Sequence, residues 1–403
     1  MSDDARPHAA GPEPPPAHDD PAATVRALGW TSFLTDLSSE AIYPLLPAFV
    51  KSLGGSSIDI GLIDGVANAV AAVVRLPAGA ISDATGRRPL VLFGYGLSAI
   101  IRPLMGVVAS PAGVILVRMA DRFGKGIRSA PRDALVSDLV DPAARGAAFG
   151  HIRAMDHAGA ALGPLVAMLF LLAFPGRERL LFLLALAPGL ATLAVIWRHV
   201  RDAPSRTPVA ARAALSPRLG RAQRLLLGSV GLWSLGAASE QFLLLRATDL
   251  GVPGPLVPLV WLVISLAKSG AATRAGGLAD RWHPRAALAA GWLLFAMAYA
   301  GLAATTGLWP ALTLVLLVGV AYGVAEPAER ALVARLAPPG GQGGAFGWYT
   351  LVQGLLALPA GLLAGWLWQQ GPHGYASAFA VTAALATAAC GLLITVREPP
   401  AAA

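Results

Sequence analysis

Residues 111–138, PAGVILVRMADRFGKGIRSAPRDALVSD, are long enough to cross a membrane as one helix, yet they carry eight charged side chains. A charge at the centre of a bilayer costs roughly 2.5–3.5 kcal/mol, so such a side chain normally faces a water-filled cavity or a partner. At about 100° per residue, seven of these charges fall within an arc of about 140°: Arg118, Asp121, Arg122, Lys125, Arg128, Arg132 and Asp133. The stretch is therefore either a soluble amphipathic helix or one wall of a polar cavity inside a membrane bundle.

The composition favours the membrane. Hydrophobic residues make up 55% and charged residues 13% of the 403-residue chain, whereas soluble domains are about 25% charged. Twelve apolar segments can each span about 30 Å of hydrocarbon: 27–50, 58–82, 88–109, 111–138, 144–173, 178–198, 223–247, 254–279, 285–306, 308–336, 342–370 and 374–396. The sequence predicts an all-α membrane protein. Its net charge of +8 comes from basic residues between these segments, which argues against a nucleic-acid-binding patch.

The connections between the segments indicate an orientation. One alternate set of connections and their flanks holds thirteen Lys and Arg residues, and the other set holds only Lys51, Arg177 and Arg179. Because basic residues accumulate on the cytoplasmic side, both termini are expected in the cytoplasm. The longest connection, 199–222, is taken as a linker between two halves. The chain then divides into five parts: a disordered tail (1–25), a six-helix bundle (26–198), the linker (199–222), a second six-helix bundle (223–397) and a short tail (398–403). The first tail lacks the apolar core of a signal peptide.

The two halves are an internal repeat. At an offset of 197, ALVSDLVDPAARGAAFG (134–150) matches ALVARLAPPGGQGGAFG (331–347) at nine of seventeen positions, and at the same offset Gly79 aligns with Gly276. Six helices per half give both repeats the same orientation, so the halves are predicted to be parallel repeats about an axis along the membrane normal.

The connection GAISDATGRRPL (79–90) resembles the signature of the major facilitator superfamily of secondary transporters, roughly G-x-L-A-D-R-x-G-R-R/K. Ala84 replaces the usual Arg of that signature, and GGLADRWHPR (276–285) is a partial second copy. The resemblance implies a gate on the cytoplasmic side, in which Asp83 faces the helix start near Gly341 and Gln342. The residues assigned to this gate are Gly79, Asp83, Gly86, Arg87, Arg88, Arg132, Asp133, Asp280 and Arg281.

Residues 150–166 carry a second pattern, G-x8-G-x3-G-P, formed by Gly150, Gly159, Gly163 and Pro164. It is similar to the antiporter motif of the drug–proton antiporter branch, although the pair of glycines that follows is missing. If these residues form an antiporter motif, the pattern favours export. A generic seam of small residues for helix packing explains the same pattern.

In this superfamily the central cavity is lined mainly by the first, fourth, seventh and tenth spans, which here hold most of the ionisable residues. The candidate substrate and proton residues are Asp36, Glu40, Arg118, Asp121, Arg122, Lys125, Arg128, Asp156, Glu240 and Glu326. Proton uptake is assigned to Asp36, Glu40, Asp121 or Asp156. Buried structural ion pairs are expected instead for Arg75, Arg102, Lys268 and Arg274. No metal site is predicted, because His151 and His157 fall on different helix faces.

These observations predict a proton-coupled secondary transporter of the bacterial inner membrane, working by alternating access and exporting a small anionic or amphoteric molecule. Its energy source would be the proton gradient, with no cofactor, and it is expected to act as a monomer in the lipid bilayer. One alternative is an importer of an anionic nutrient or siderophore on the same fold. Another is a membrane-embedded enzyme or a non-transporting receptor, for which the sequence offers neither a nucleophile with its base nor a signalling domain.

Overall fold

The computed structural model describes residues 21–141, 144–202, 219–237, 239–279, 283–337 and 341–396. Every regular element within these ranges is a helix, which confirms the all-α prediction for this part of the chain. Nine of the helical spans in it are long and apolar enough to cross a membrane. The other three predicted spans are the charged segment 111–138 and two spans that are interrupted, 27–50 and 223–247.

The first half contains α1 (Pro21–Ile42), η1 (Tyr43–Leu45), α2 (Leu46–Ser52), α3 (Ser57–Thr85), α4 (Arg87–Ile101), η2 (Arg102–Gly106), α5 (Pro111–Leu139), α6 (Arg145–Ala173), α7 (Glu178–Leu184) and α8 (Leu186–His199). Local chemistry sets several helix starts. Ser56 and Asp59 form a capping box at the start of α3, and the Ser110 hydroxyl accepts from the Gly113 N–H at 3.2 Å at the start of α5. At these two starts, polar caps satisfy free N–H groups of the first turn.

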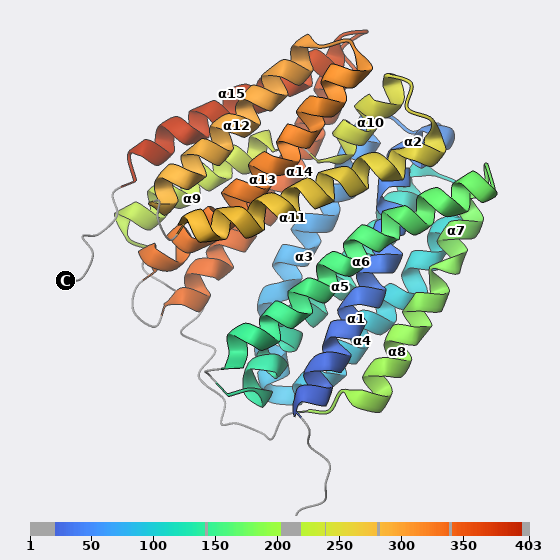
Figure 1. The fold of residues 1–403 in the computed structure, drawn as a ribbon. Coiled ribbons are helices and arrows are strands. Elements are labelled where there is room, and N and C mark those ends of the chain that lie inside the picture. Colours follow the sequence, from blue (N-terminus) through green and yellow to red (C-terminus); the bar gives the residue numbers. More distant parts are fainter. Residues whose placement is uncertain are drawn as a thin grey trace, which may run out of the picture.

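The second half contains α9 (Arg221–Gly236), α10 (Gln241–Asp249), η5 (Gly254–Leu256), α11 (Val257–Ala279), α12 (Pro284–Ala304), α13 (Leu308–Leu336), α14 (Gln342–Trp368) and α15 (Gly374–Ile394). Figure 1 shows the two halves lying side by side. The end of the bundle where α1 begins and α15 ends is called here the terminal end, and the end with α2, α7 and α10 is called the far end.

Three sequence boundaries need correction. α1 begins at Pro21, inside the segment predicted as a tail, because proline is well suited to the first turn of a helix. The span 27–50 changes to a 3-10 turn at Tyr43, just before Pro44, which lacks an N–H for the helical ladder. The span 223–247 is broken between Gly236 and Gln241, where the Ser239 hydroxyl accepts from the Gln241 N–H at 3.2 Å.

The most extensive packing between the halves is that of α3 on α14 and of α6 on α11, and α10 also packs on α2. Between α3 and α14 the backbones touch, since a Cβ added at Gly61 would overlap the carbonyl of Gly361, and one added at Gly361 would overlap that of Gly61. Both glycines lie toward the far end, near the start of α3 and late in α14. The halves are therefore closely apposed at the far end.

Candidate functional site

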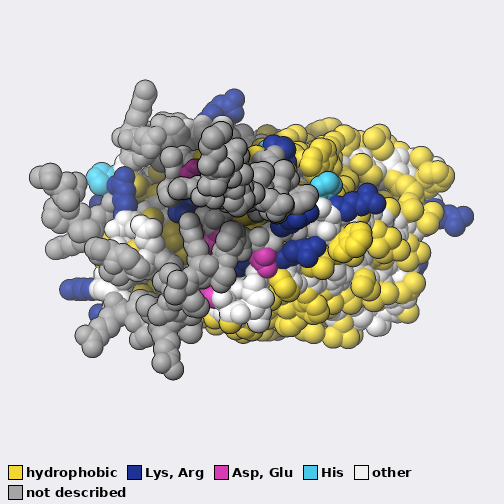
Figure 2. Space-filling model, turned by 90° about the horizontal axis from the view of Figure 1, so that it is seen from below, with side chains coloured by type: hydrophobic (Ala, Val, Ile, Leu, Met, Phe, Trp, Pro, Cys, Tyr) yellow, Lys and Arg dark blue, Asp and Glu magenta, His cyan; other side chains and the backbone are white. Residues whose placement is uncertain are grey.

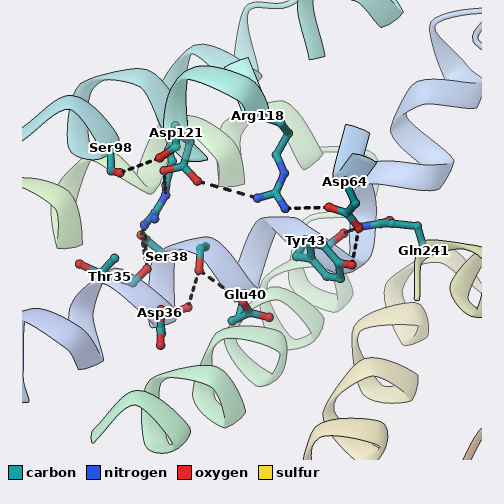
Figure 3. A network of polar contacts seen from close by, with 12 residues as sticks. Thr35, Asp36, Ser38, Glu40, Tyr43, Asp64, Ser98, Arg118, Asp121 and Gln241 are labelled. Carbon is teal, nitrogen blue, oxygen red and sulfur yellow. Dashed lines mark hydrogen bonds and ion pairs between the residues drawn. The ribbon is translucent and has the colours of Figure 1, made fainter. Parts of the chain in front are cut away.

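Part of the charged face of α5 lies in a buried network in the first half (Figure 3). The Arg102 Nε donates to the Asp121 carboxylate at 2.8 Å, and the Arg102 Nη1 donates to the Thr35 carbonyl and the Ser38 hydroxyl, each at 2.7 Å. The side chains of Arg102 and Asp121 are only 8% and 3% exposed. This network ties α5 to η2 and α1, and it confirms the structural ion pair predicted for Arg102.

Asp64 extends the network to the second half. Its Oδ1 accepts from Arg118 at 3.1 Å, and its Oδ2 accepts from the hydroxyls of Tyr43 and Ser239, each at 2.6 Å. The Gln241 amide donates to the Tyr43 carbonyl at 3.2 Å. Ser239 and Gln241 lie at the break between α9 and α10, so the broken helix supplies the contacts across the halves.

A second polar contact across the halves involves Glu40, whose Oε2 accepts from the Trp261 indole at 2.8 Å. The ring of Trp261 also lies 4.8 Å from that of Tyr43, centroid to centroid. Asp36, one turn earlier on α1, has no cation within ion-pair distance among the described residues. Of the two acids predicted on α1, Glu40 thus lies at the contact between the halves, and Asp36 is an unpaired acid.

Three adjoining pockets, all lined in part by Asn68, form a cavity between the halves. The first, of about 340 Å³, is lined by Arg75, Arg122 and Lys125. The second, of about 360 Å³, includes Glu326 in its wall. The third, of about 160 Å³, reaches Tyr43, Asp64, Ser239 and Glu240.

The cavity is more accessible from the terminal end than from the far end. The side chains of Arg75, Glu326 and Arg330 are 43%, 44% and 50% exposed, whereas those of Arg118 and Asp64 are 5% and 10% exposed. Figure 2 shows the molecule from below the view of Figure 1. On the face seen there, acidic and basic side chains gather near the middle, beside a broad apolar surface. The chain is therefore open toward the terminal end and closed at the far end by contacts between the halves.

The predicted site residues divide into two groups. Four line the cavity: Arg122, Lys125, Glu240 and Glu326. Of the others, Asp36 forms no ion pair in the described part of the chain, and the rest are bound to neighbouring helices. Arg128, for example, donates to the Ser98 hydroxyl at 2.7 Å and stacks over the Tyr95 ring, so it contacts α4. Asp156 lies 3.5 Å from Arg153 and 3.9 Å from Arg132.

The expected buried ion pair is found for Arg102, whereas Arg75 lies 3.6 Å from Asp133 in a pair whose side chains are 43% and 32% exposed. No ion-pair partner is found for Lys268 or Arg274 among the described residues. Lys268 lies over the Tyr322 ring and lines two pockets, and Arg274 donates to the carbonyl of Gly270. Together with Asp64, Lys268 is a functional candidate that the sequence analysis missed. The available signal was an ionisable residue inside an apolar span.

Several gating residues of the first half are held by ion pairs and hydrogen bonds. Asp83 pairs with Arg87, which also donates to Asp138 at 3.3 Å. The backbone N–H groups of Arg87 and Arg88 donate to Asp202 at 2.9 and 3.1 Å. Gly86 has φ = 93°, a conformation that glycine adopts readily, and it forms the tight turn between α3 and α4.

The predicted gate contact itself is not made in this conformation. Within the described residues, Asp83 forms no hydrogen bond or ion pair with the start of α14, as fits an open terminal end. Arg132 donates to Asp133 at 3.1 Å and to Ser32 at 2.9 Å. Asp280 and Arg281, from the second copy of the signature, lie outside the described residues.

The glycine pattern of α6 supports helix packing. A Cβ at Gly163 would lie 2.7 Å from the Leu37 carbonyl of α1, and one at Gly159 would overlap the Phe33 carbonyl. Pro164 lies inside a continuous helix. Gly150 has nothing within 4 Å of an added Cβ, so it takes no part in this seam.

This seam gives a stability prediction. Gly163→Leu is expected to destabilise the protein by about 1–3 kcal/mol, because the new side chain meets backbone of α1. Gly150→Leu is the matched control, and its thermal unfolding temperature should not fall. Equal melting temperatures for the two variants would contradict close packing of α1 on α6.

Comparisons with known proteins agree with this architecture. The family model described as Major Facilitator Superfamily matches residues 28–360 and 242–403. An uncharacterised MFS-type transporter of Methanocaldococcus jannaschii is 30% identical over 87% of this chain and 89% of its own. The multidrug resistance protein MdtH of Cronobacter sakazakii is 28% identical over 86% and 88%.

A solved structure shows the same fold. The bacterial homologue of the human lysosomal transporter Spinster, in an inward-facing and occupied conformation, superposes with a TM-score of 0.78 at 16% identity, covering 94% of this chain and 99% of that one. The family match and this fold agree with the twelve spans, the two similar halves and the cavity between them. The chain therefore belongs to the Major Facilitator Superfamily of membrane transporters.

Proposed function

We propose that this chain is a proton-coupled exporter of a small anionic or amphoteric molecule, working by alternating access in the bacterial inner membrane. The observation that carries the proposal is the charged cavity between two similar halves, closed at the far end and accessible from the terminal end. Rocking of the halves about this cavity would expose it to the other side. Similarity to a multidrug resistance protein supports export.

The ion-pair geometry narrows the choice of proton carrier. Neutralising Asp121 would leave Arg102 without its partner, and neutralising Asp156 would weaken its contacts with two arginines. Leaving a buried charge unpaired is costly. Asp36 has no ion-pair partner in the described part of the chain, and Glu40 is bound by the Trp261 indole, so either can change its protonation without breaking an ion pair. We therefore assign the proton to Asp36 or Glu40.

The experiment is a transport assay in proteoliposomes with a pH-sensitive dye in the lumen and a compound library outside. Export by antiport predicts compound-dependent proton movement opposite to that of the compound. Asp36→Asn is expected to reduce this coupled flux about tenfold or more, in the range typical for loss of a proton-transfer group. Asp141→Asn, at an exposed position outside the cavity, is the control and should keep the flux.

Two outcomes would contradict parts of the proposal. Movement of compound and proton in the same direction would indicate a symporter and hence import of an anionic nutrient. Full coupled flux in both Asp36→Asn and Glu40→Gln would exclude these two acids as proton carriers.

A further inference from the structure

The two walls of the cavity differ in chemistry. The pocket against α3 and α5 is lined by three cations, Arg75, Arg122 and Lys125, and by no acidic residue. The pocket against the second half carries two carboxylates together with aromatic and cationic side chains: Trp233, Lys268, Tyr322, Glu326, Glu329, Arg330 and Tyr349. Asn68 and Gln353 line both pockets, so the two walls enclose one continuous space.

Glu329 is the unusual member of the second wall. It is only 2% exposed, and its Oε1 accepts from the Gln353 amide at 3.3 Å. No cation lies within ion-pair distance of it among the described residues, while the neighbouring Glu326 is bound by Arg330 at 2.9 Å. A carboxyl group buried without a counter-charge is costly to ionise. A cationic group brought by a ligand to this part of the cavity wall would stabilise its ionised form.

Hydrogen-bonding groups without a partner lie on the same cavity wall as Glu329. Trp233 and Ser234 are 7% and 6% exposed, and the indole N–H and the hydroxyl have no partner in the described part of the chain. Trp233 is held by stacking on Trp292, with centroids 5.8 Å apart, and by an edge contact with Tyr322 at 5.7 Å. Fixed aromatic rings on a wall that also carries a carboxyl group suit a flat cationic group.

The first wall carries cations that form no ion pair within the described residues. The Arg122 Nε is buried and has no hydrogen-bond partner in the described residues, and neither Arg122 nor Lys125 forms an ion pair there. Arg128 and Arg118, on the same helix, are already bound to Ser98 and Asp64. Two free cations on a cavity wall suit a carboxylate or phosphate of a ligand.

We propose that the cavity binds a small amphoteric aromatic molecule across the two halves. Its anionic group lies at Arg122 and Lys125, and its cationic group lies at Glu329 and Trp233. A purely anionic ligand leaves Glu329 without a counter-charge, and a purely cationic ligand leaves Arg122 and Lys125 without one. The inference rests on the proposed transport function and specifies its substrate class.

The test uses three dyes of one skeleton and the full-length protein purified in detergent. They are an amphoteric rhodamine with a free carboxylate, its methyl ester, which keeps only the cation, and fluorescein, which keeps only the anion. Fluorescence polarisation gives the affinities. The amphoteric dye is expected to bind about tenfold more tightly than either of the others, because a hydrogen bond to a charged group contributes about 1.5–3 kcal/mol.

Variants locate the two ends of the ligand. Arg122→Gln should weaken the amphoteric dye and fluorescein about tenfold and leave the ester unchanged, and Glu329→Gln should weaken the amphoteric dye and the ester but not fluorescein. Arg274→Gln and Glu178→Gln, outside the cavity lining, should leave all three affinities unchanged. Circular dichroism and gel filtration confirm that each variant is folded before its affinities are compared.

Equal affinities for the three dyes, a reversed pattern in the two variants, or no binding of the amphoteric dye up to its solubility limit would overturn the inference. The assay needs no gradient. Loss of coupled flux with the dye pattern intact would therefore reject only the transport proposal, and coupled flux without the dye pattern would reject only the substrate class.

Discussion

Replacing Asp121 with alanine is expected to destabilise the protein by about 3–5 kcal/mol, the cost of removing one partner of a buried ion pair. Arg102 would lose its 2.8 Å contact, and Arg118 would lose a carboxylate 3.9 Å away. Both guanidiniums are at most 8% exposed, so water cannot replace the carboxylate without opening the bundle. The measurement is the temperature at which half of the purified protein survives heating, read by fluorescence-detected gel filtration.

Two further variants make this prediction specific. Asp133→Ala removes an acid that is 32% exposed, and its effect should stay within about 1 kcal/mol, as for most exposed pairs. The double variant Arg102→Met with Asp121→Leu should recover much of the loss, because no charge at this pair is left unpaired and Arg118 keeps Asp64 at 3.1 Å. Equal melting of the Asp121→Ala and Asp133→Ala variants would contradict a structural role for this ion pair.

The sequence predicts the membrane bundle and its charged fourth span because these depend on local patterns. Length and hydropathy define the spans, and the angular position of each charge follows from helix geometry. These patterns do not indicate which neighbouring helix each charged residue of that face contacts. On α5, Arg118 meets Asp64 of α3, Arg128 meets Ser98 of α4, and Arg122 faces the cavity. The arc of about 140° is the same for all three.

Local sequence patterns cannot predict the contacts between the halves, for a different reason. Ser239 and Asp64 are 175 positions apart, and nothing near either residue in the sequence indicates the other. The break that positions Ser239 follows a close contact of α9 with α15, since a Cβ at Gly236 would lie 2.7 Å from the Leu385 side chain. Contacts of this kind between distant segments position the residues that close the far end, and local patterns do not indicate them.

Substitution of Gly61 with valine is expected to shift the protein away from the conformation closed at the far end. The added side chain would overlap the Gly361 carbonyl, which belongs to the backbone of α14 and cannot rotate away as a side chain can. Overpacking of this kind costs about 1–3 kcal/mol. Because only the closed conformation bears this cost, the population ratio of the two conformations should change roughly 5- to 150-fold.

A cysteine reporter measures that shift. Cys390 is the only cysteine, so Cys390→Ala with Ser57→Cys places a single thiol at a position that is 2% exposed in the closed far end. Maleimide labelling of this thiol should accelerate in Gly61→Val, and less in Gly61→Ala. Gly146→Val, where an added Cβ meets nothing within 4 Å, should leave the rate unchanged. A reporter that stays protected in Gly61→Val, while the protein remains folded, would mean that the contact between Gly61 and Gly361 does not hold the far end closed. The labelling rate should rise from Gly61→Ala to Gly61→Val only if this contact forms and breaks as the halves move. A contact present in both conformations would change the stability of the protein but leave the labelling rate unchanged.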